Sequence, residues 1–280
     1  MELSVVIPVQ NELGNIEPLI AETVAQFEGR CRYEIVVVDD ASRDGTLESL
    51  RALQGTTPAL RVLHLNTPSG QSCAVWTGIR AARAPFIATL DGDGQNDPAD
   101  LPRLLELLKT ESRRSSVALV MGRRRHRLDT GWRRLSSRIA NGIRGRLLGD
   151  QTPDSGCGIK VFLRETFLQL PHFNHMHRFL PALFRRQGAD VRSVDVNHRP
   201  RGQGRSHYGT LDRLMAGIAD LAGMLWLIRR ARLPQVQEIG QAAGSEDERD
   251  VVLRPASSPV LGMAFLSSSV VAAEGRRFAA

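Results

Sequence analysis

Cysteine is scarce in this chain of 280 residues, and the few cysteines present follow no metal-binding or disulfide pattern. Cys31, Cys73 and Cys157 are an odd number and lie far apart in the sequence. Such a set is typical of a protein whose thiols stay reduced. We therefore expect a cytoplasmic location.

Long apolar runs are also missing. A membrane-spanning helix needs about 20 uninterrupted apolar residues, and no such stretch occurs. Residues 211–228 come closest, but Asp212, Arg213 and Asp220 interrupt them. The sequence also enters a strand-like pattern at once, without the basic and apolar segments of a signal peptide. We expect neither a leader nor a spanning helix.

Aromatic residues make up only 5% of the chain, whereas the formal net charge is +7 and the pI is near 10.2. A basic protein attracts polyanions such as nucleic acid, anionic lipid or phosphorylated substrates. The basic residues concentrate in 113–146 and 178–205, without the interleaved aromatics of a base-stacking platform. We therefore expect a phosphate-bearing membrane surface as the partner, and no nucleic acid.

Short apolar runs rich in β-branched residues indicate strands that are buried on both faces. They cover residues 3–9, 34–39, 61–65, 86–90 and 117–121. Helical patterns alternate with them at residues 15–27, 46–53, 72–82 and 101–108, and Asp97 and Pro98 mark the start of the last one. This alternation predicts an α/β fold with a mostly parallel sheet and a ligand site at the carboxyl ends of its strands.

Residues 123–148 have a different pattern, with arginines around one apolar helical face. That face consists of Trp132, Leu135, Ile139, Ile143 and Leu147. The pattern predicts an amphipathic helix at a membrane interface, and a surface helix packed on the core is the alternative. After residue 234 the pattern decays, so we expect one folded domain over 1–234 and a largely disordered tail over 235–280.

Acidic residues follow three of the predicted strands. Asp91 and Asp93, separated by one glycine, can turn toward one hard cation such as Mg²⁺ or Mn²⁺, although the pattern also fits a loop of solvated acids. Asp39 and Asp40 end the second strand, where carboxylates can accept hydrogen bonds from a ribose or a base. Glu12 follows the first strand, where its carboxylate could also bind a ribose or a base. The alternative is that it only forms part of a strand-to-helix turn.

Four segments occur in one order that resembles the family 2 glycosyltransferases of the GT-A fold. They are residues 6–12, 37–46, 70–72 and 90–98. More narrowly, they resemble dolichol-phosphate-mannose synthases and bacterial polyprenyl-phosphate enzymes, over residues 3 to about 230. The resemblance implies inverting, metal-dependent transfer of a sugar from a GDP- or UDP-linked donor to a polyprenyl phosphate. Close relatives often add C-terminal spanning helices, and none is expected here. We therefore expect peripheral attachment at the cytoplasmic face of the membrane through residues 123–148, with 211–228 as a second candidate.

The resemblance also implies roles for individual positions. Pro8, Glu12 and Asp39 would contact the nucleotide, and Asp91 would contact both the nucleotide and the metal. Asp93 and Gln95 would complete the Mg²⁺ or Mn²⁺ site.

Two further candidates lie in residues 154–162, which resemble a segment that reads G-F-R or G-L-K in the family. Lys160 is one of only two lysines and would act as a point charge at a phosphate, with a chance surface position as the alternative. The acceptor is a phosphate monoester with a second pKa of about 6, so it is already nucleophilic. Asp154 is the candidate if a base is needed.

Basic residues near the end of the domain suggest phosphate binding. Residues 199–209 resemble an R-x-x-G-x-S-K-Y/L element that closes over phosphates, which implies this role for Arg199, Arg201 and Ser206. His207 stands where the family usually has lysine, and a neutral imidazole would weaken the clamp. Arg178, in a segment that borders the acceptor in bacterial members, is the candidate for the lipid phosphate.

Other functions fit the sequence less well. Transfer to a polysaccharide or lipopolysaccharide is the first alternative, but processive members carry a Q-x-x-R-W motif and spanning helices, and neither occurs here. A catalytically weak nucleotide- or lipid-binding scaffold is the second alternative, which His207 suggests. The intact Asp91, Asp93 and Gln95 argue against it.

Overall fold

A seven-stranded sheet organises the chain in the order β3-β2-β1-β4-β6-β5-β7. This computed structural model describes residues 1–124, 142, 144–150, 152–200 and 210–230, with only the backbone described for 210–216. The strands are β1 (Leu3–Val9), β2 (Tyr33–Asp40), β3 (Leu60–Leu65), β4 (Phe86–Thr89), β5 (Val117–Arg124), β6 (Lys160–Leu163) and β7 (Asp190–Val196).

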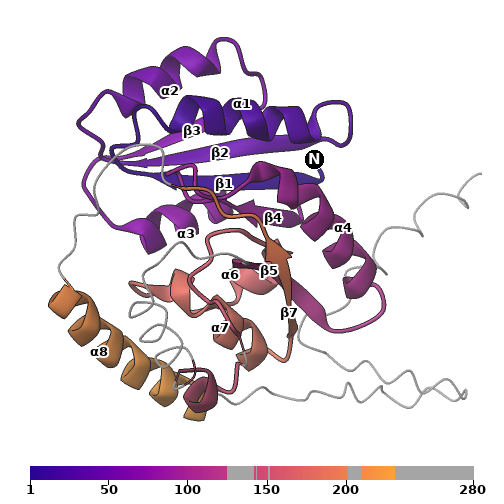
Figure 1. Cartoon of the computed structure of the whole chain (residues 1–280), viewed down its shortest axis with the longest axis vertical. Helices are drawn as coiled ribbons and strands as arrows, with labels where there is room; N and C mark the ends of the chain where they lie inside the picture. Colours follow the sequence, from indigo (N-terminus) through magenta and orange to yellow (C-terminus); the bar gives the residue numbers. More distant parts are fainter. Residues whose placement is uncertain (125–141, 143, 151, 201–209, 231–280) are drawn as a thin grey trace, which may run out of the picture.

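Helices cover both faces of this sheet (Figure 1). They are α1 (Ile16–Phe27), α2 (Thr46–Gln54), α3 (Gln71–Ala81), α4 (Leu101–Ser112), α6 (Arg164–Leu168), α7 (Leu180–Arg186) and α8 (Thr210–Arg229), with 3-10 turns at η1 (Pro98–Asp100) and η2 (Met176–Arg178). The five strands expected from the sequence are confirmed, and β1, β2, β3 and β4 are parallel. The mostly parallel α/β prediction is therefore correct.

Alternate residues of β1 pack against different helices, as the pleat of a strand requires. Val5 and Ile7 lie in a cluster with apolar residues of α1, α2 and α4. Val6 lies in a second cluster with α3, α7 and α8. All seven residues of β1 are buried, and burying each large aliphatic side chain stabilises the fold by about 1.5–3 kcal/mol. Helices thus pack on both faces of the parallel half of the sheet, and the carboxyl ends of its strands lie together in fixed positions.

Three details differ from the sequence prediction. β3 is an edge strand, so most of its residues are only partly buried, not buried on both faces. The side chain of Asp97 accepts a hydrogen bond from the Ala99 N–H at 3.0 Å, but it caps η1, and α4 follows and extends to Ser112. β6, which was not expected, runs antiparallel between β4 and β5.

The predicted amphipathic helix over residues 123–148 is wrong at its start, because β5 continues through Arg124. Backbone pairing with β7 extends to the same residue, so strand pairing overrides the local helical pattern. Trp132, Leu135, Ile139 and Ile143 lie outside the described residues, as does the tail from 235 to 280. Residues 144–148 are helical, and Leu147 is 49% exposed.

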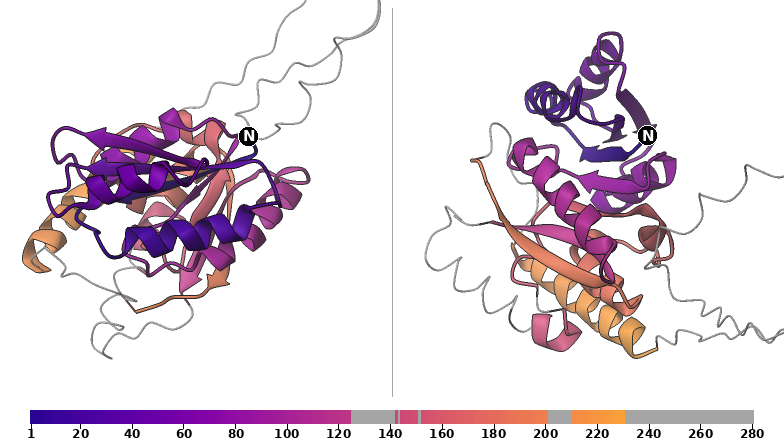
Figure 2. Two further views of the ribbon diagram at one scale, coloured as in Figure 1. Left: turned by 90° about the horizontal axis from the view of Figure 1, so that it is seen from above. Right: turned by 90° about the vertical axis from the view of Figure 1, so that its right-hand side faces the viewer.

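Helix α8 contains residues 211–228, the stretch of the sequence that comes closest to a long apolar run. It lies at the opposite end of the molecule from α1 and α2 (Figures 1 and 2). Met224 is buried in the core, whereas Ile218 and Trp226 are 56% and 62% exposed. Among the residues that the structure describes, no helix has both the length and the apolar character needed to cross a bilayer.

Candidate active site

Two consecutive carboxylates at the end of β2 have different partners. Asp40 accepts hydrogen bonds from the backbone N–H groups of Ser69 and Gly70, at 2.6 and 2.8 Å, and so fixes the loop that begins α3. Asp39 is fully buried on the other face of the strand, where its Oδ2 accepts a hydrogen bond from His64 Nδ1 at 2.7 Å. Asp40 is therefore structural, and Asp39 is the residue of the pair that is available for a ligand.

The turn after β1 is locked to the turn after β2. Asn11, with a φ of 57°, accepts a hydrogen bond from the Arg43 N–H at 2.8 Å and donates its own N–H to Ser42 Oγ at 2.9 Å. The Glu12 N–H donates to Thr46 Oγ1 at 3.0 Å. These contacts place Glu12 and the buried Pro8 at the same edge of the sheet as Asp39.

Asp91 and Asp93 follow β4 at this same edge. Gln71 at the start of α3 donates a hydrogen bond to Asp91 Oδ1 at 2.9 Å, and the Gln95 N–H donates to Asp93 Oδ1 at 3.1 Å. Burial raises the pKa of Asp91, and the nearby charge of Asp93 raises it further. The two acids thus repel each other at close range, which a bound cation would relieve.

This pair fits a divalent ion as a two-carboxylate site. Oxygen ligands suit Mg²⁺ and Mn²⁺, which usually complete their coordination with waters and substrate phosphates. Among the described residues, no three His, Cys, Asp or Glu side chains gather into a metal site made by protein alone. Waters and the diphosphate of a donor are the usual further ligands of such a site.

Gly158 brings the second half of the chain against Asp91. A Cβ at this position would lie 2.0 Å from Asp91 Oδ2 and 2.6 Å from Asn96 Oδ1, so any side chain would displace the carboxylate. Thr89 at the end of β4 fixes the same residue by donating to the Gly158 carbonyl at 2.8 Å. The close approach therefore needs glycine.

Lys160 is buried beside this cluster, so the alternative of a chance surface position is wrong. Its ammonium donates to the Cys157 carbonyl, and burial lowers its pKa, while the charges of Asp91 and Asp154 favour the charged form. A cation in such a low-dielectric position interacts strongly with a phosphate. The role of Lys160 as a point charge at a phosphate stays a prediction.

Arg124 is a residue that the sequence prediction missed. Its Nε and Nη2 donate to the two oxygens of Asp154, each at 2.8 Å. Asp154 is 6% exposed and already holds this bidentate pair, so a role as base stays a prediction, and its visible role is to orient Arg124. The signal that could have revealed Arg124 is its position at the end of β5. The sequence pattern instead predicts a helix that begins at residue 123.

The segment before α7 is fixed on two sides. His177 Nδ1 and Ser72 Oγ are 2.7 Å apart, and burial, followed by the charge of Lys160, lowers the pKa of His177 to about 3. His175 Nδ1 lies 2.7 Å from Asp220 Oδ2 of α8. Arg178 is exposed next to these contacts, which is consistent with its candidate role at the acceptor.

The candidate phosphate clamp is only partly described. Arg199 donates to Glu22 Oε2 at 2.7 Å and to Asp97 Oδ1 at 2.8 Å, so its guanidinium already anchors the chain after β7. Its backbone N–H also donates to the Gln95 carbonyl, at 2.9 Å. Arg201, Ser206 and His207 lie outside the described residues, and their roles stay predictions.

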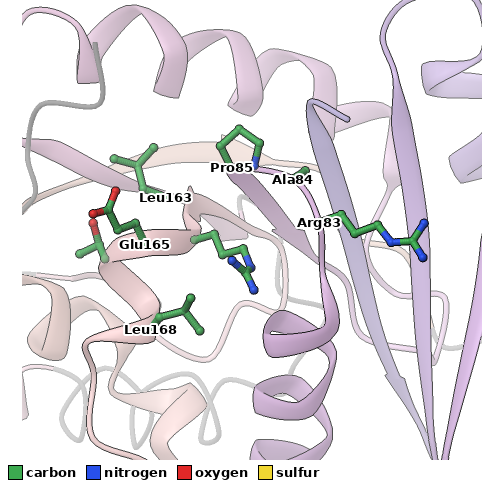
Figure 3. A pocket seen from close by; sticks show the side chains of 8 residues that line it. Arg83, Ala84, Pro85, Leu163, Glu165 and Leu168 are labelled. Atoms are coloured by element: carbon green, nitrogen blue, oxygen red, sulfur yellow. The ribbon is translucent and has the colours of Figure 1, made fainter. Parts of the chain in front are cut away.

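A cavity of about 400 Å³ lies elsewhere, at the amino end of β4 (Figure 3). Its lining includes Pro85, Leu163, Glu165 and Leu168. Pro85 precedes β4 whereas Asp91 follows it, so this cavity is at the opposite edge of the sheet from the carboxylates. Ligands of open α/β sheets bind at the carboxyl edge, and we place the candidate site there.

The fold, and the position of the carboxylates at the strand ends, define an α/β glycosyltransferase of the GT-A type. The family model for glycosyl transferase family 2 matches residues 4–170. The chain therefore belongs to this family and is a glycosyltransferase.

Characterised relatives are similar over most of the chain. It is 34% identical over 239 residues to the dodecaprenyl-phosphate galacturonate synthase of Rhizobium johnstonii, which covers 84% of this chain and 69% of that protein. It is 32% identical over 212 residues to the undecaprenyl-phosphate 4-deoxy-4-formamido-L-arabinose transferase of Shewanella sediminis, covering 75% and 62%. The chain thus spans less than two thirds of the second relative.

A solved structure supports the fold. Glucosyl-3-phosphoglycerate synthase of Mycobacterium tuberculosis, in complex with Mg²⁺ and UDP, superposes with a TM-score of 0.63 at 21% identity, covering 85% of this chain and 82% of that one. At this identity the likeness concerns the fold alone.

Proposed function

We propose that this chain transfers a sugar from a GDP- or UDP-linked donor to a polyprenyl phosphate, with inversion and with Mg²⁺ or Mn²⁺. The observation that carries the proposal is the meeting of Asp39, Asp91 and Asp93 at one edge of the sheet. The relatives named above, which act on dodecaprenyl and undecaprenyl phosphate, support the acceptor.

Each group has a role in an in-line displacement. An oxygen of the acceptor phosphate attacks the anomeric carbon, and the bond from that carbon to the diphosphate breaks. The acceptor is largely a dianion near neutral pH, because its second pKa is about 6, so positioning matters more than a strong base. Asp91 and Asp93 would hold the metal, which supplies Lewis-acid stabilisation of the leaving diphosphate when bound.

The chain's own cations complete the stabilisation. Lys160 lies beside Asp91, and Arg124 is held in place by Asp154, so both positive charges are fixed before substrate binds. A preorganised charge loses little free energy to reorganisation during the reaction. Arg178 is proposed to contact the acceptor phosphate, and Arg201, Ser206 and His207 are proposed to close over the donor.

Attachment at the cytoplasmic membrane surface is part of the proposal. Ile218 and Trp226 of α8 are exposed, and so are Arg229 and Arg230 at its C-terminal end, where the Arg230 guanidinium lies 6.0 Å from the centre of the Trp226 ring. Aromatic and basic side chains together favour the interface of an anionic bilayer. We expect the protein to float with anionic liposomes at low salt, and a protein that stays at the bottom of the gradient would exclude this attachment.

The direct test is synthesis of a lipid-linked sugar. The protein is incubated with polyprenyl phosphate, Mg²⁺ or Mn²⁺ and a panel of nucleotide sugars, and lipid extracts are analysed by mass spectrometry. Asp93→Ala should lower product formation by at least about 100-fold, because a charged group at the leaving diphosphate is lost. Asp190→Asn, at the exposed start of β7, is the matched control and should keep full activity.

A further inference from the structure

We propose that His64 is a specificity-determining residue that makes the base site select uracil over guanine, because it leaves Asp39 one acceptor oxygen. This inference rests on the proposed function, since it concerns the base of the same donor. It narrows the donor to uridine-type nucleoside diphosphates.

His64 and Asp39 are direct neighbours across the parallel pair of β3 and β2. Their side chains therefore share one face of the sheet, and Nδ1 of His64 lies 2.7 Å from Oδ2 of Asp39. A carboxylate can only accept, so the imidazole Nδ1–H is the donor. The Ser42 N–H lies 3.4 Å from the same oxygen, so Oδ2 is committed to the protein.

The other oxygen of Asp39 has no such contact. Oδ1 is buried and has no hydrogen-bond partner among the described residues. A buried acceptor without a donor is unfavourable, and more so when it carries charge. The strand end is thus prepared to accept one hydrogen bond at Oδ1, at the edge where Glu12 and Asp91 also lie.

One acceptor oxygen matches uracil better than guanine. Uracil presents a single N3–H donor between two carbonyl oxygens. Guanine presents two adjacent donors, N1–H and the N2 amino group, which pair best with both oxygens of one carboxylate. Cytosine has an acceptor at N3 and would face the carboxylate lone pairs. Polar sites that leave a group unpaired discriminate strongly against the wrong ligand.

The first test compares bases on the unaltered protein. Calorimetry with Mn²⁺ present measures the binding of UDP, GDP, CDP and N3-methyl-UDP. UDP should bind about 10- to 100-fold more tightly than each of the others, which is the effect of one hydrogen bond to a charged group. GDP that binds as tightly as UDP, or N3-methyl-UDP that equals UDP, would overturn the inference.

The second test changes His64 itself. His64→Leu removes the shorter of the two contacts to Oδ2 and leaves only the Ser42 N–H at 3.4 Å, so the preference for UDP over GDP should fall by at least about fivefold. His64→Gln keeps an N–H donor and should retain much of the preference. His172→Leu is the control, because His172 packs on Trp76 on the other face of the sheet. An unchanged preference in folded His64→Leu would also overturn the inference.

The outcomes separate this inference from the proposed function. If none of the four diphosphates binds, the donor site itself is wrong and both proposals fail. If GDP binds preferentially, the transferase proposal stands and only the role of His64 falls.

Discussion

The two halves of the sheet place their functional residues in different ways. In the half from β1 to β4, the carboxylates follow directly after parallel strands and are fixed by short loops that bond to each other. In the half from β5 to β7, a buried charged pair joins segments that are far apart in the sequence, Arg124 of β5 with Asp154 of the loop before β6. The functional residues of the first half can be predicted from local motifs, whereas the positions of those in the second half depend on tertiary contacts.

The largest expected effect tests whether the second half depends on its buried pair. Arg124→Leu removes the guanidinium that pairs with the buried Asp154 carboxylate, so the free energy of unfolding should fall by about 3–5 kcal/mol. Urea denaturation measures this change. Arg123→Leu is the matched control, because Arg123 and its partner Asp195 are 51% and 37% exposed, and it should leave the free energy of unfolding nearly unchanged. Equal losses in both variants would contradict the comparison.

A smaller effect is expected where the two halves touch. Gly158→Ala places a methyl group against Asp91 and should lower kcat by about 100-fold, since misplacement of a catalytic group by about 1 Å has such an effect. Gly156→Ala is the control, because its nearest neighbour would be Arg124 Nη2 at 3.6 Å, an ordinary contact. Activity assays and metal-binding calorimetry measure the change. A fully active Gly158→Ala would show that the halves are not coupled there.

These contacts explain how much the sequence alone could predict. The parallel strands, and the gathering of Asp39 with Asp91 and Asp93, followed from apolar runs that end in acids, because parallel strands share a carboxyl edge. The bond from His64 to Asp39 could not be predicted, since it depends on the register of β3 on β2. Arg124 was assigned to a helix because an arginine run has no feature that separates a strand end from an amphipathic surface.

β6 was missed for a related reason. β6 begins with a lysine, so its apolar run is only the three residues after Lys160, and only its position between β4 and β5 makes it a strand. The burial of Lys160 follows from that position, which is why the sequence left a surface location open. The structure of the first half can therefore be predicted from local sequence patterns, whereas that of the second half depends on which strands pair with each other.

The contact of His177 with Ser72, which joins the two halves, should make the stability of the protein depend on pH. The pKa of His177 is lowered to about 3, whereas an unfolded histidine titrates near 6.5. Between these values the unfolded chain binds more protons, so stability rises with pH and is lost on acidification. From pH 7 to pH 5, His177 should account for a loss of about 2 kcal/mol.

Replacement of His177 isolates this contribution. His177→Gln cannot titrate, so its free energy of unfolding, measured in urea from pH 5 to pH 7.5, should depend less on pH than that of the unaltered protein. Identical pH profiles for His177→Gln and the unaltered protein would mean that His177 takes up a proton as easily when folded as when unfolded.

The smallest expected effect concerns the link between α8 and the segment that carries Arg178. His175 and Asp220 are 32% and 20% exposed, so their contact contributes less than about 1 kcal/mol to stability. Because it positions the residues next to Arg178, Asp220→Asn should raise the KM for polyprenyl phosphate about three- to fivefold and leave the KM for the donor unchanged. Arg192→Gln, whose partner Glu111 lies far from η2, should change neither constant. If both KM values rise together in Asp220→Asn, the contact supports the whole fold and does not serve the acceptor half in particular.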